Sequence, residues 1–335
     1  MLPAKSGQGG FDSHTLPPVI FSMSNKGVSV RKVGLVYHEA MLKHEPPRWH
    51  PEGKDRLIRI LDTLKRSELW DRLVHIRPGE ARLDDVARVH SWEHIEKIRT
   101  SGEGSLDPDT YTSVGSMEAA LYAAGSVIKA VETCAQGEAT RIFCLVRPPG
   151  HHAEADAAMG FCLFNNVAIG ARFAQKIGYG RVFIVDFDAH HGNGTQHIFE
   201  EDDTVFYFST HQYPYYPDTG KDLERGRGRG TGYTYNVQIL RGSGNKDYLA
   251  VYQDILPDVV RRFGPDLILV SAGYDIHVKD PHADIRVSNE GIRDVVRGIL
   301  TSSSCPMIFV LEGGYDLESL SDSVAITIEE MLSLP

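Results

Sequence analysis

Short apolar segments alternate with longer amphipathic segments along almost the whole chain from Val33 onward. The apolar segments are rich in β-branched and aromatic residues and lack polar alternation, which is typical of strands buried on both faces of a parallel sheet. Six segments have this character: Val33–Tyr37, Ile142–Val146, Val182–Phe187, Thr204–Phe208, Leu267–Ser271 and Met307–Leu311.

Between the expected strands, apolar residues recur with the spacing of amphipathic helices. The clearest helical patterns are Asp55–Arg66, Gly115–Cys134, Asn166–Ile177, Asp247–Phe263 and Asn289–Thr301. Strands that alternate with helices predict βαβ units, so the expected fold class is α/β. Because no linker or internal repeat interrupts the pattern, we expect a single three-layer α/β/α domain over residues 31–335, with a mostly parallel central sheet.

Residues 1–30 have a different composition, rich in Ser, Gly and Pro and with Asp12 as their only acid. We expect a loosely ordered N-terminal extension, and an organelle transit peptide is the alternative interpretation. The segment lacks the charged, apolar and small-residue regions of a secretory signal. The four cysteines form no C-x-x-C pair and are too sparse for a disulfide framework, which favours a reducing, cytoplasmic location.

The composition is that of a globular protein: 41% of the 335 residues are hydrophobic and 24% are charged, with a formal net charge of −10. An acidic surface repels phosphate groups, so direct nucleic-acid binding is not expected. No apolar run reaches the roughly 20 residues that a membrane span needs, and we expect no membrane partner. The oligomeric state is left open.

The sequence contains an unusually high number of histidines, 15, and six of them lie between residues 151 and 211. Two adjacent pairs stand out. His151-His152 follow the expected strand Ile142–Val146, and His190-His191 follow the strand Val182–Phe187. Both pairs are therefore expected at the carboxyl ends of strands, where open α/β sheets bind their ligands.

A metal site is predicted at the same edge of the sheet. Asp186, Asp188 and His190 are spaced i, i+2, i+4, which directs all three side chains the same way while the chain is extended. Two carboxylates and an imidazole brought together inside a protein need a compensating cation. Two further strand ends contribute an acid and a tyrosine, Asp275 after Leu267–Ser271 and Tyr315 after Met307–Leu311.

These residues occur in stretches that resemble the zinc-dependent histone deacetylase family, in its class II and bacterial branch with the acetylpolyamine amidohydrolases, within the arginase/deacetylase fold. The stretches keep the order of that family: His50-Pro51-Glu52 with Arg56, Val89-His90, Arg147–Ala153, Gly160–Asn166, Asp186–Gly194, Ser271–Asp275 and Glu312–Tyr315. The resemblance implies that residues 31–335 form a deacetylase catalytic domain.

The resemblance also implies a mononuclear metal site. Asp188, His190 and Asp275 correspond to the metal ligands, with an open position for water and the substrate carbonyl. Zn²⁺ is the ion implied by the family, although an oxygen-rich ligand set also suits Fe²⁺ or Co²⁺. The backbone oxygens of Asp186, Asp188 and His190, together with the Ser209 hydroxyl, correspond to a structural potassium site.

Catalytic roles follow from the same correspondence. His151 and His152 correspond to the tandem histidines, with Asp186 orienting His151 and Asn193 facing His152. Asn193 stands where class I members usually have Asp, and an amide cannot favour a protonated ring as a carboxylate does. We therefore expect His152 to transfer the proton and His151 to act electrostatically. Tyr315 corresponds to the phenol that donates to the developing oxyanion.

The walls of a narrow acyl-lysine channel are also implied. Gly160, Phe161 and Tyr216 correspond to its sides, and His282 to a side chain at its mouth that sets specificity. Arg56 corresponds to the exit path for acetate. Either Asp107 or Asp109 corresponds to the residue that grips the substrate backbone.

The expected function is metal-dependent removal of an acetyl or other acyl group from lysine side chains, with release of acetate. The expected substrate is thus an acetylated lysine peptide or protein, and an acetylated polyamine or other small acyl-amine is the alternative. A binuclear ureohydrolase would need further acids at positions occupied by Gly192 and His277. An inactive acyl-lysine reader would be expected to lack a metal ligand or Tyr315, and none is missing.

Overall fold

The computed structural model describes residues 32–334, and the N-terminal extension expected over residues 1–30 lies outside the described residues. An eight-stranded sheet forms the centre of the described part, in the order β2-β1-β5-β10-β9-β6-β7-β8. Every neighbouring pair of these strands is parallel. The strands are β1 (Val33–Val36), β2 (Leu73–Ile76), β5 (Arg141–Cys144), β6 (Val182–Asp186), β7 (Val205–Gln212), β8 (Thr234–Ile239), β9 (Leu267–Ala272) and β10 (Met307–Leu311).

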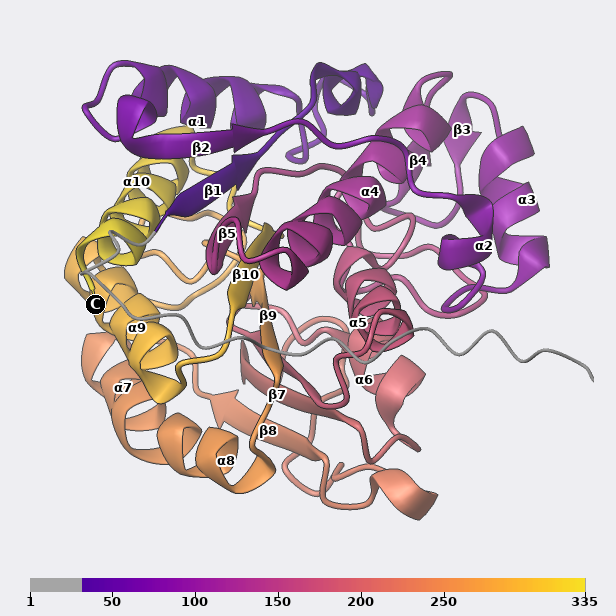
Figure 1. Ribbon diagram of the computed structural model, residues 1–335. Helices are drawn as coiled ribbons and strands as arrows, with labels where there is room; N and C mark the ends of the chain where they lie inside the picture. Colours follow the sequence, from indigo (N-terminus) through magenta and orange to yellow (C-terminus); the bar gives the residue numbers. More distant parts are fainter. Residues whose placement is uncertain (1–31, 335) are drawn as a thin grey trace, which may run out of the picture. The chain divides into compact units, whose positions relative to one another are not determined.

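Helices cover both faces of the sheet (Figure 1). On one face α1 (Asp55–Lys65) packs on α10 (Leu317–Ser333), and α9 (Asn289–Ser302) packs on α10, α7 (Asn245–Ala250) and α8 (Leu256–Phe263). On the other face α4 (Ser116–Ala135) packs on α5 (Asn166–Lys176). The expected three-layer α/β/α fold is thus confirmed.

Shorter elements lie in the connections. They are the helices α2 (Leu83–Val86), α3 (Trp92–Thr100) and α6 (Asn193–Phe199), the antiparallel hairpin of β3 (Gly104–Ser105) and β4 (Tyr111–Thr112), and 3-10 turns at Glu39–Lys43, Trp70–Arg72 and Gly228–Gly230.

The two strands without an apolar run in the sequence, β2 and β8, are the edge strands of the sheet. Each is only partly buried, so its sequence mixes polar and apolar residues and carries a weak strand signal. Strand β7 is longer than expected, because its last four residues, Ser209–Gln212, are polar but buried. Polar partners explain this burial: Thr210 bonds to the Tyr252 hydroxyl at 2.9 Å, and His211 bonds to the Gly220 carbonyl at 2.8 Å.

The helix expected over Asp247–Phe263 is formed by α7 and α8 joined through a π-helical turn at Val251–Ile255. Pro257 lies in the first turn of α8. A proline inside a helix lacks the backbone N–H for an i→i−4 bond and clashes with the preceding turn. The wider turn lets the chain remain helical past this position.

Five neighbouring strands in the middle of the sheet bring the polar segments together. In spatial order these are β5, β10, β9, β6 and β7. Because all five are parallel, their carboxyl ends lie at one edge, and the segments beginning at Arg147, Asp186, Ser209, Asp275 and Glu312 meet there.

A buried ion pair fixes the turn that leads from β5 to the tandem histidines. The Arg147 guanidinium donates to both carboxylate oxygens of Glu52, at 2.9 and 2.8 Å, and both residues are fully buried. Burial opposes ionisation of Glu52, but Arg147, His44 and Arg56 lower its pKa to about 2. Since this pKa lies below the ordinary value, the ion pair stabilises the folded state at neutral pH, and this contribution is lost only as the pH falls toward about 2.

We expect Glu52→Gln to lower the free energy of unfolding by about 3–5 kcal/mol, because it leaves the Arg147 charge buried without its counter-ion. Denaturant titration measures the change. Glu45→Gln is the matched control, since Glu45 pairs with Lys54 on the surface, where its side chain is 59% exposed. It should leave the free energy of unfolding nearly unchanged, because exposed ion pairs contribute little to stability. Equal effects of the two substitutions would contradict the importance of the buried pair.

Candidate active site

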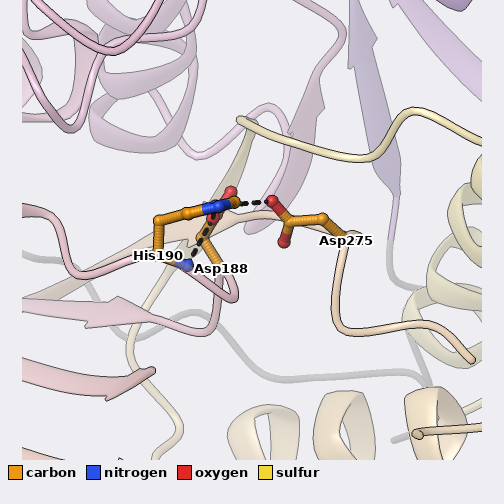
Figure 2. A group of neighbouring side chains, drawn as sticks. All are labelled: Asp188, His190 and Asp275. Atoms are coloured by element: carbon orange, nitrogen blue, oxygen red, sulfur yellow. Dashed lines mark hydrogen bonds and ion pairs between the residues drawn. The ribbon is translucent and has the colours of Figure 1, made fainter. Parts of the chain in front are cut away.

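Asp188, His190 and Asp275 come together at the ends of β6 and β9, and their potential ligand atoms all lie within 4.8 Å of one another. His190 Nδ1 is 3.0 Å from Asp188 Oδ1 and 3.0 Å from Asp275 Oδ2. Figure 2 shows both carboxylates directed at the imidazole ring. The two aspartates are almost completely buried. The structure therefore brings the three expected metal ligands into one cluster.

The surroundings of the cluster fit a cation. Gly273 and Gly313 leave room for the carboxylates: a Cβ on Gly313 would lie 2.4 Å from Asp275 Oδ2, and one on Gly273 would lie 1.9 Å from Asp188 Oδ2. Burial and the neighbouring Asp188 carboxylate raise the pKa of Asp275 to about 7. One imidazole and two carboxylates are donors that suit a divalent transition metal, whose charge would offset their mutual repulsion.

His151 and His152 lie beside the cluster with their rings 4.0 Å apart, but their partners differ. His151 Nδ1 is 3.1 Å from Asp186 Oδ2, as an ion pair. Burial opposes protonation of His151, but the Asp186 and Asp188 carboxylates raise its pKa to about 10. His152 bonds instead to the neutral amide of Asn193. Burial and the neighbouring His151 hold the pKa of His152 well below its usual range.

The hydrogen bonds of Asn193 define the tautomer of His152. Asn193 Nδ2 donates to the Glu154 carboxylate at 2.5 Å, and a carboxylate can only accept. The amide oxygen must then be the atom that faces His152 Nδ1, at 2.8 Å, so Nδ1 carries the proton. His152 Nε2 is left with its lone pair. Sequence reasoning named Asn193 but missed Glu154, which carries no signal of this role in its local sequence.

Tyr315 follows the Gly313-Gly314 turn after β10, and two aromatic rings and one guanidinium group lie around its own ring. The Phe161 ring lies 5.8 Å away, the His282 ring 4.6 Å away, and the Arg56 guanidinium 5.2 Å from the ring centroid. Arg56 is buried, and its Nε donates to the Gly314 carbonyl at 2.7 Å. Burial raises the pKa of the Tyr315 phenol well above its usual range, so this group is a hydrogen-bond donor at neutral pH.

A cavity of about 210 Å³ connects these groups. All four expected channel residues line it, together with the metal-cluster histidine, His152 and Tyr315. The lining residues are Asp109, His152, Gly160, Phe161, His190, Tyr215, Tyr216, His282 and Tyr315. His151 is not among them, so of the tandem pair it is His152 that faces the cavity.

Comparison with known proteins identifies the family. Residues 50–331 match the model of the histone deacetylase domain. The chain belongs to the histone deacetylase family. A probable deacetylase of Methanothermobacter thermautotrophicus is 43% identical over 281 residues, which cover 82% of this chain and 83% of that protein. A probable deacetylase of Archaeoglobus fulgidus is 40% identical over 293 residues, with 85% and 82% covered.

Eukaryotic members of the histone deacetylase family are also similar. The crystal structure of the HDA15 HD domain superposes with a TM-score of 0.87 at 36% identity, and covers 91% of this chain and 89% of that one. The human polyamine deacetylase HDAC10 is 36% identical over 323 residues, although the chain spans only 48% of its length. Within residues 32–334, no helix of this deacetylase is long and apolar enough to span a bilayer.

Asp107 and Asp109 were both expected as candidates for one position beside the cavity. Asp107 Oδ1 accepts from the backbone N–H groups of Asp109 and Thr110, at 3.0 and 2.6 Å, and so shapes its own loop. Asp109 lines the cavity, whereas Asp107 does not. Of the two candidates, Asp109 is therefore the one that reaches the cavity.

Other positions implied by the deacetylase family have clear partners. Ser209 lies beside Asp186 in the register of β7 and β6, and its Oγ is 2.9 Å from His211 Nδ1. Asp186 Oδ2 also accepts from the Tyr207 hydroxyl at 3.1 Å, a contact that sequence reasoning missed.

Phe161 has a φ of +68°, which is rare outside glycine, and its backbone N–H donates to Thr110 Oγ1.

Two further residues of the site were not assigned a role from sequence. Glu312 is fully buried and accepts from the backbone N–H groups of Gly150 and His151, at 2.6 and 3.2 Å, so it fixes the tandem-histidine turn. Tyr215 stacks on the His190 ring at 5.5 Å, and its hydroxyl donates to the His282 carbonyl. Glu312 stood out only as part of the Glu312–Tyr315 motif, and Tyr215 only as a neighbour of Tyr216.

Proposed function

We propose that the protein is a zinc-dependent deacetylase that hydrolyses the acetyl amide of lysine side chains and releases acetate. The observation that supports the proposal is the shared cavity, whose lining includes His190 of the candidate metal cluster, His152 and Tyr315. Each of the three groups has a distinct task in hydrolysis of an amide.

Asp188, His190 and Asp275 would hold the metal ion. When bound, a zinc ion supplies a Lewis acid that polarises the amide carbonyl and acidifies a water molecule. Fe²⁺ and Co²⁺ are compatible with the same two carboxylates and one imidazole. A structural potassium ion, held by backbone oxygens of residues 186, 188 and 190 with the Ser209 hydroxyl, remains part of the proposal.

His152 acts as the proton-transfer group. Its Nε2 is free to accept a proton from the attacking water, because Glu154 and Asn193 keep the other ring nitrogen protonated. The proton can then pass to the departing amine, as general acid–base catalysis requires. His151, which forms an ion pair with Asp186 and does not line the cavity, contributes positive charge near the reacting groups.

Tyr315 provides an oxyanion donor. Its neutral phenol can donate to the carbonyl oxygen as negative charge develops there. The aromatic rings of Phe161 and Tyr216 line the cavity that would receive the aliphatic stem of the acyl-lysine, with His282 also on its wall. Arg56 would line the path for acetate, although its bonds to the Tyr315 turn give it a structural task as well.

A binuclear ureohydrolase is disfavoured by two positions. A Cβ on Gly192 would already lie 2.3 Å from Asp186 Oδ2, so an acid cannot be placed there without rearrangement. His277 is turned to Asn289, whose Oδ1 is 3.0 Å from its Nε2. Over residues 32–334, the only group of three or more metal-ligating side chains is Asp188, His190 and Asp275.

An acetylated polyamine is the second candidate substrate, favoured by the similarity to a protein named polyamine deacetylase. The two substrates are compared by measuring kcat/KM on an acetyl-lysine peptide, on acetylputrescine and on acetylspermidine. We expect the peptide to be preferred by about tenfold or more, because Asp109 can accept hydrogen bonds from its backbone N–H groups.

Asp109→Asn is the matched variant for this comparison. It should reduce kcat/KM on the peptide and leave kcat/KM on acetylputrescine and acetylspermidine nearly unchanged. A higher kcat/KM on the acetylated polyamines than on the peptide would mean that the substrate is an acetylated polyamine and not acetyl-lysine. Equal and very low values on all three compounds would point to a different acyl group.

A further inference from the structure

Asp280 is a buried carboxylate in the loop between β9 and α9 that reaches two walls of the cavity. It is 7% exposed. Its Oδ2 accepts from the backbone N–H groups of Tyr315 and Asp316, at 2.6 and 3.3 Å. Its Oδ1 accepts from the backbone N–H of His282 at 2.9 Å. One side chain thus binds the segment that carries the catalytic phenol and the segment that carries the mouth residue.

The Tyr315 turn needs such a restraint. Gly314 has a φ of +118°, a conformation open mainly to glycine, and Gly313 precedes it, so the backbone before Tyr315 has little intrinsic stiffness. Arg56 holds the carbonyl groups of Glu312 and Gly314. Asp280 binds the backbone N–H groups of Tyr315 and Asp316. The ring contact between His282 and Tyr315, at 4.6 Å, spans the two segments that Asp280 joins.

We propose that Asp280 is a positioning residue that fixes the Tyr315 phenol against the cavity and couples it to the His282 loop. The inference rests on the proposed role of Tyr315 in deacetylation. A displacement of a catalytic group by about 1 Å can reduce a rate about 100-fold, which makes a restraint of this kind important for turnover.

The physical part of the proposal is tested by hydrogen–deuterium exchange on the intact protein. Asp280→Asn keeps the size of the side chain but places an N–H₂ group against backbone donors. We expect the backbone N–H groups of Tyr315, Asp316 and His282 to exchange about tenfold faster or more, because a charge-assisted hydrogen bond is lost. Asp284→Asn is the matched control, since Asp284 lies on the same loop and pairs with Arg241 at the surface.

The catalytic part is tested by a double-mutant cycle with Tyr315→Phe. In the wild-type background, Asp280→Asn should lower kcat about 100-fold while KM changes less than about threefold. In the Tyr315→Phe background, the same substitution should change kcat by less than about threefold, because the group it positions is gone. Metal content should stay unchanged, since Asp280 is not a ligand.

The outcomes separate the two proposals. Unchanged exchange at residues 315 and 316, or an equal loss of kcat in both backgrounds, would overturn the role of Asp280. Full activity of Tyr315→Phe alone would instead overturn the proposed role of the phenol, and the exchange data would still report on Asp280. If Asp280→Asn does not fold, Asp280→Ala is used for the same measurements, because water can replace the missing carboxylate.

Discussion

Asp275→Asn is expected to remove the metal ion and lower kcat/KM at least about 1,000-fold. The substitution preserves the size of the side chain and the bond from the Ala189 N–H, but it removes one of the two negative charges that would hold the cation. A Lewis acid at this position is worth several kcal/mol of transition-state stabilisation, and each 1.36 kcal/mol is a tenfold change in rate. Elemental analysis should give about one metal ion per wild-type chain and almost none in the variant.

The matched control for this substitution is Asp266→Asn. Asp266 directly precedes β9, at the opposite end of the strand from Asp275, and accepts from the backbone N–H groups of Gly180 and Arg181. Its replacement should leave metal content unchanged. Chelation of the wild-type enzyme should reproduce the loss of activity, and adding back Zn²⁺, Fe²⁺ or Co²⁺ in turn should show which ion restores it. A content near two ions per chain would favour the binuclear ureohydrolase instead.

His152→Ala should reduce kcat by a factor of about 10²–10⁴, the usual contribution of a general acid–base group. The ring faces the cavity and is not part of the metal cluster, so metal content should change little. Steady-state kinetics on an acetyl-lysine peptide measures the loss, and added imidazole should restore part of the rate. Near-normal turnover would disprove the proton-transfer role.

Two histidine variants complete this test. His75→Ala is the control, because His75 lies on the edge strand β2 and bonds to the Trp70 carbonyl far along the sheet from the cavity. It should change kcat less than about twofold. A loss of turnover in His151→Ala, together with retained turnover in His152→Ala, would mean that the two histidines have exchanged roles.

Local sequence was sufficient to predict the central part of the fold. Strands such as β6 and β10 are buried on both faces, so every residue in them is apolar up to the strand end, and the chain itself carries the signal. The edge strands β2 and β8 face solvent in part and lack that signal. The buried polar end of β7 was missed for a related reason, since its partners lie in other segments.

The metal ligands were predictable because the carboxyl ends of parallel strands lie at the same edge of a sheet. Asp188 and Asp275 each follow an apolar run, and parallel pairing of β6 with β9 then brings them together. The tandem histidines follow β5 in the same way. Their identification as ligands and catalytic groups still depended on resemblance to a family, because spacing alone does not assign a chemical role.

The sequence by itself thus determined the α/β class, the strand ends that carry chemistry and the residue types at the cavity. Only the tertiary structure decided how those side chains are oriented. Glu154 determines the orientation of the Asn193 amide, Glu312 holds the tandem-histidine turn, and Asp280 holds the Tyr315 turn. These carboxylates, of which Glu312 and Asp280 are buried and Glu154 is partly exposed, bond to groups far away in the sequence, and mostly to backbone N–H groups that every residue possesses. Because such partners leave no pattern along the chain, their roles become visible only when the chain is folded.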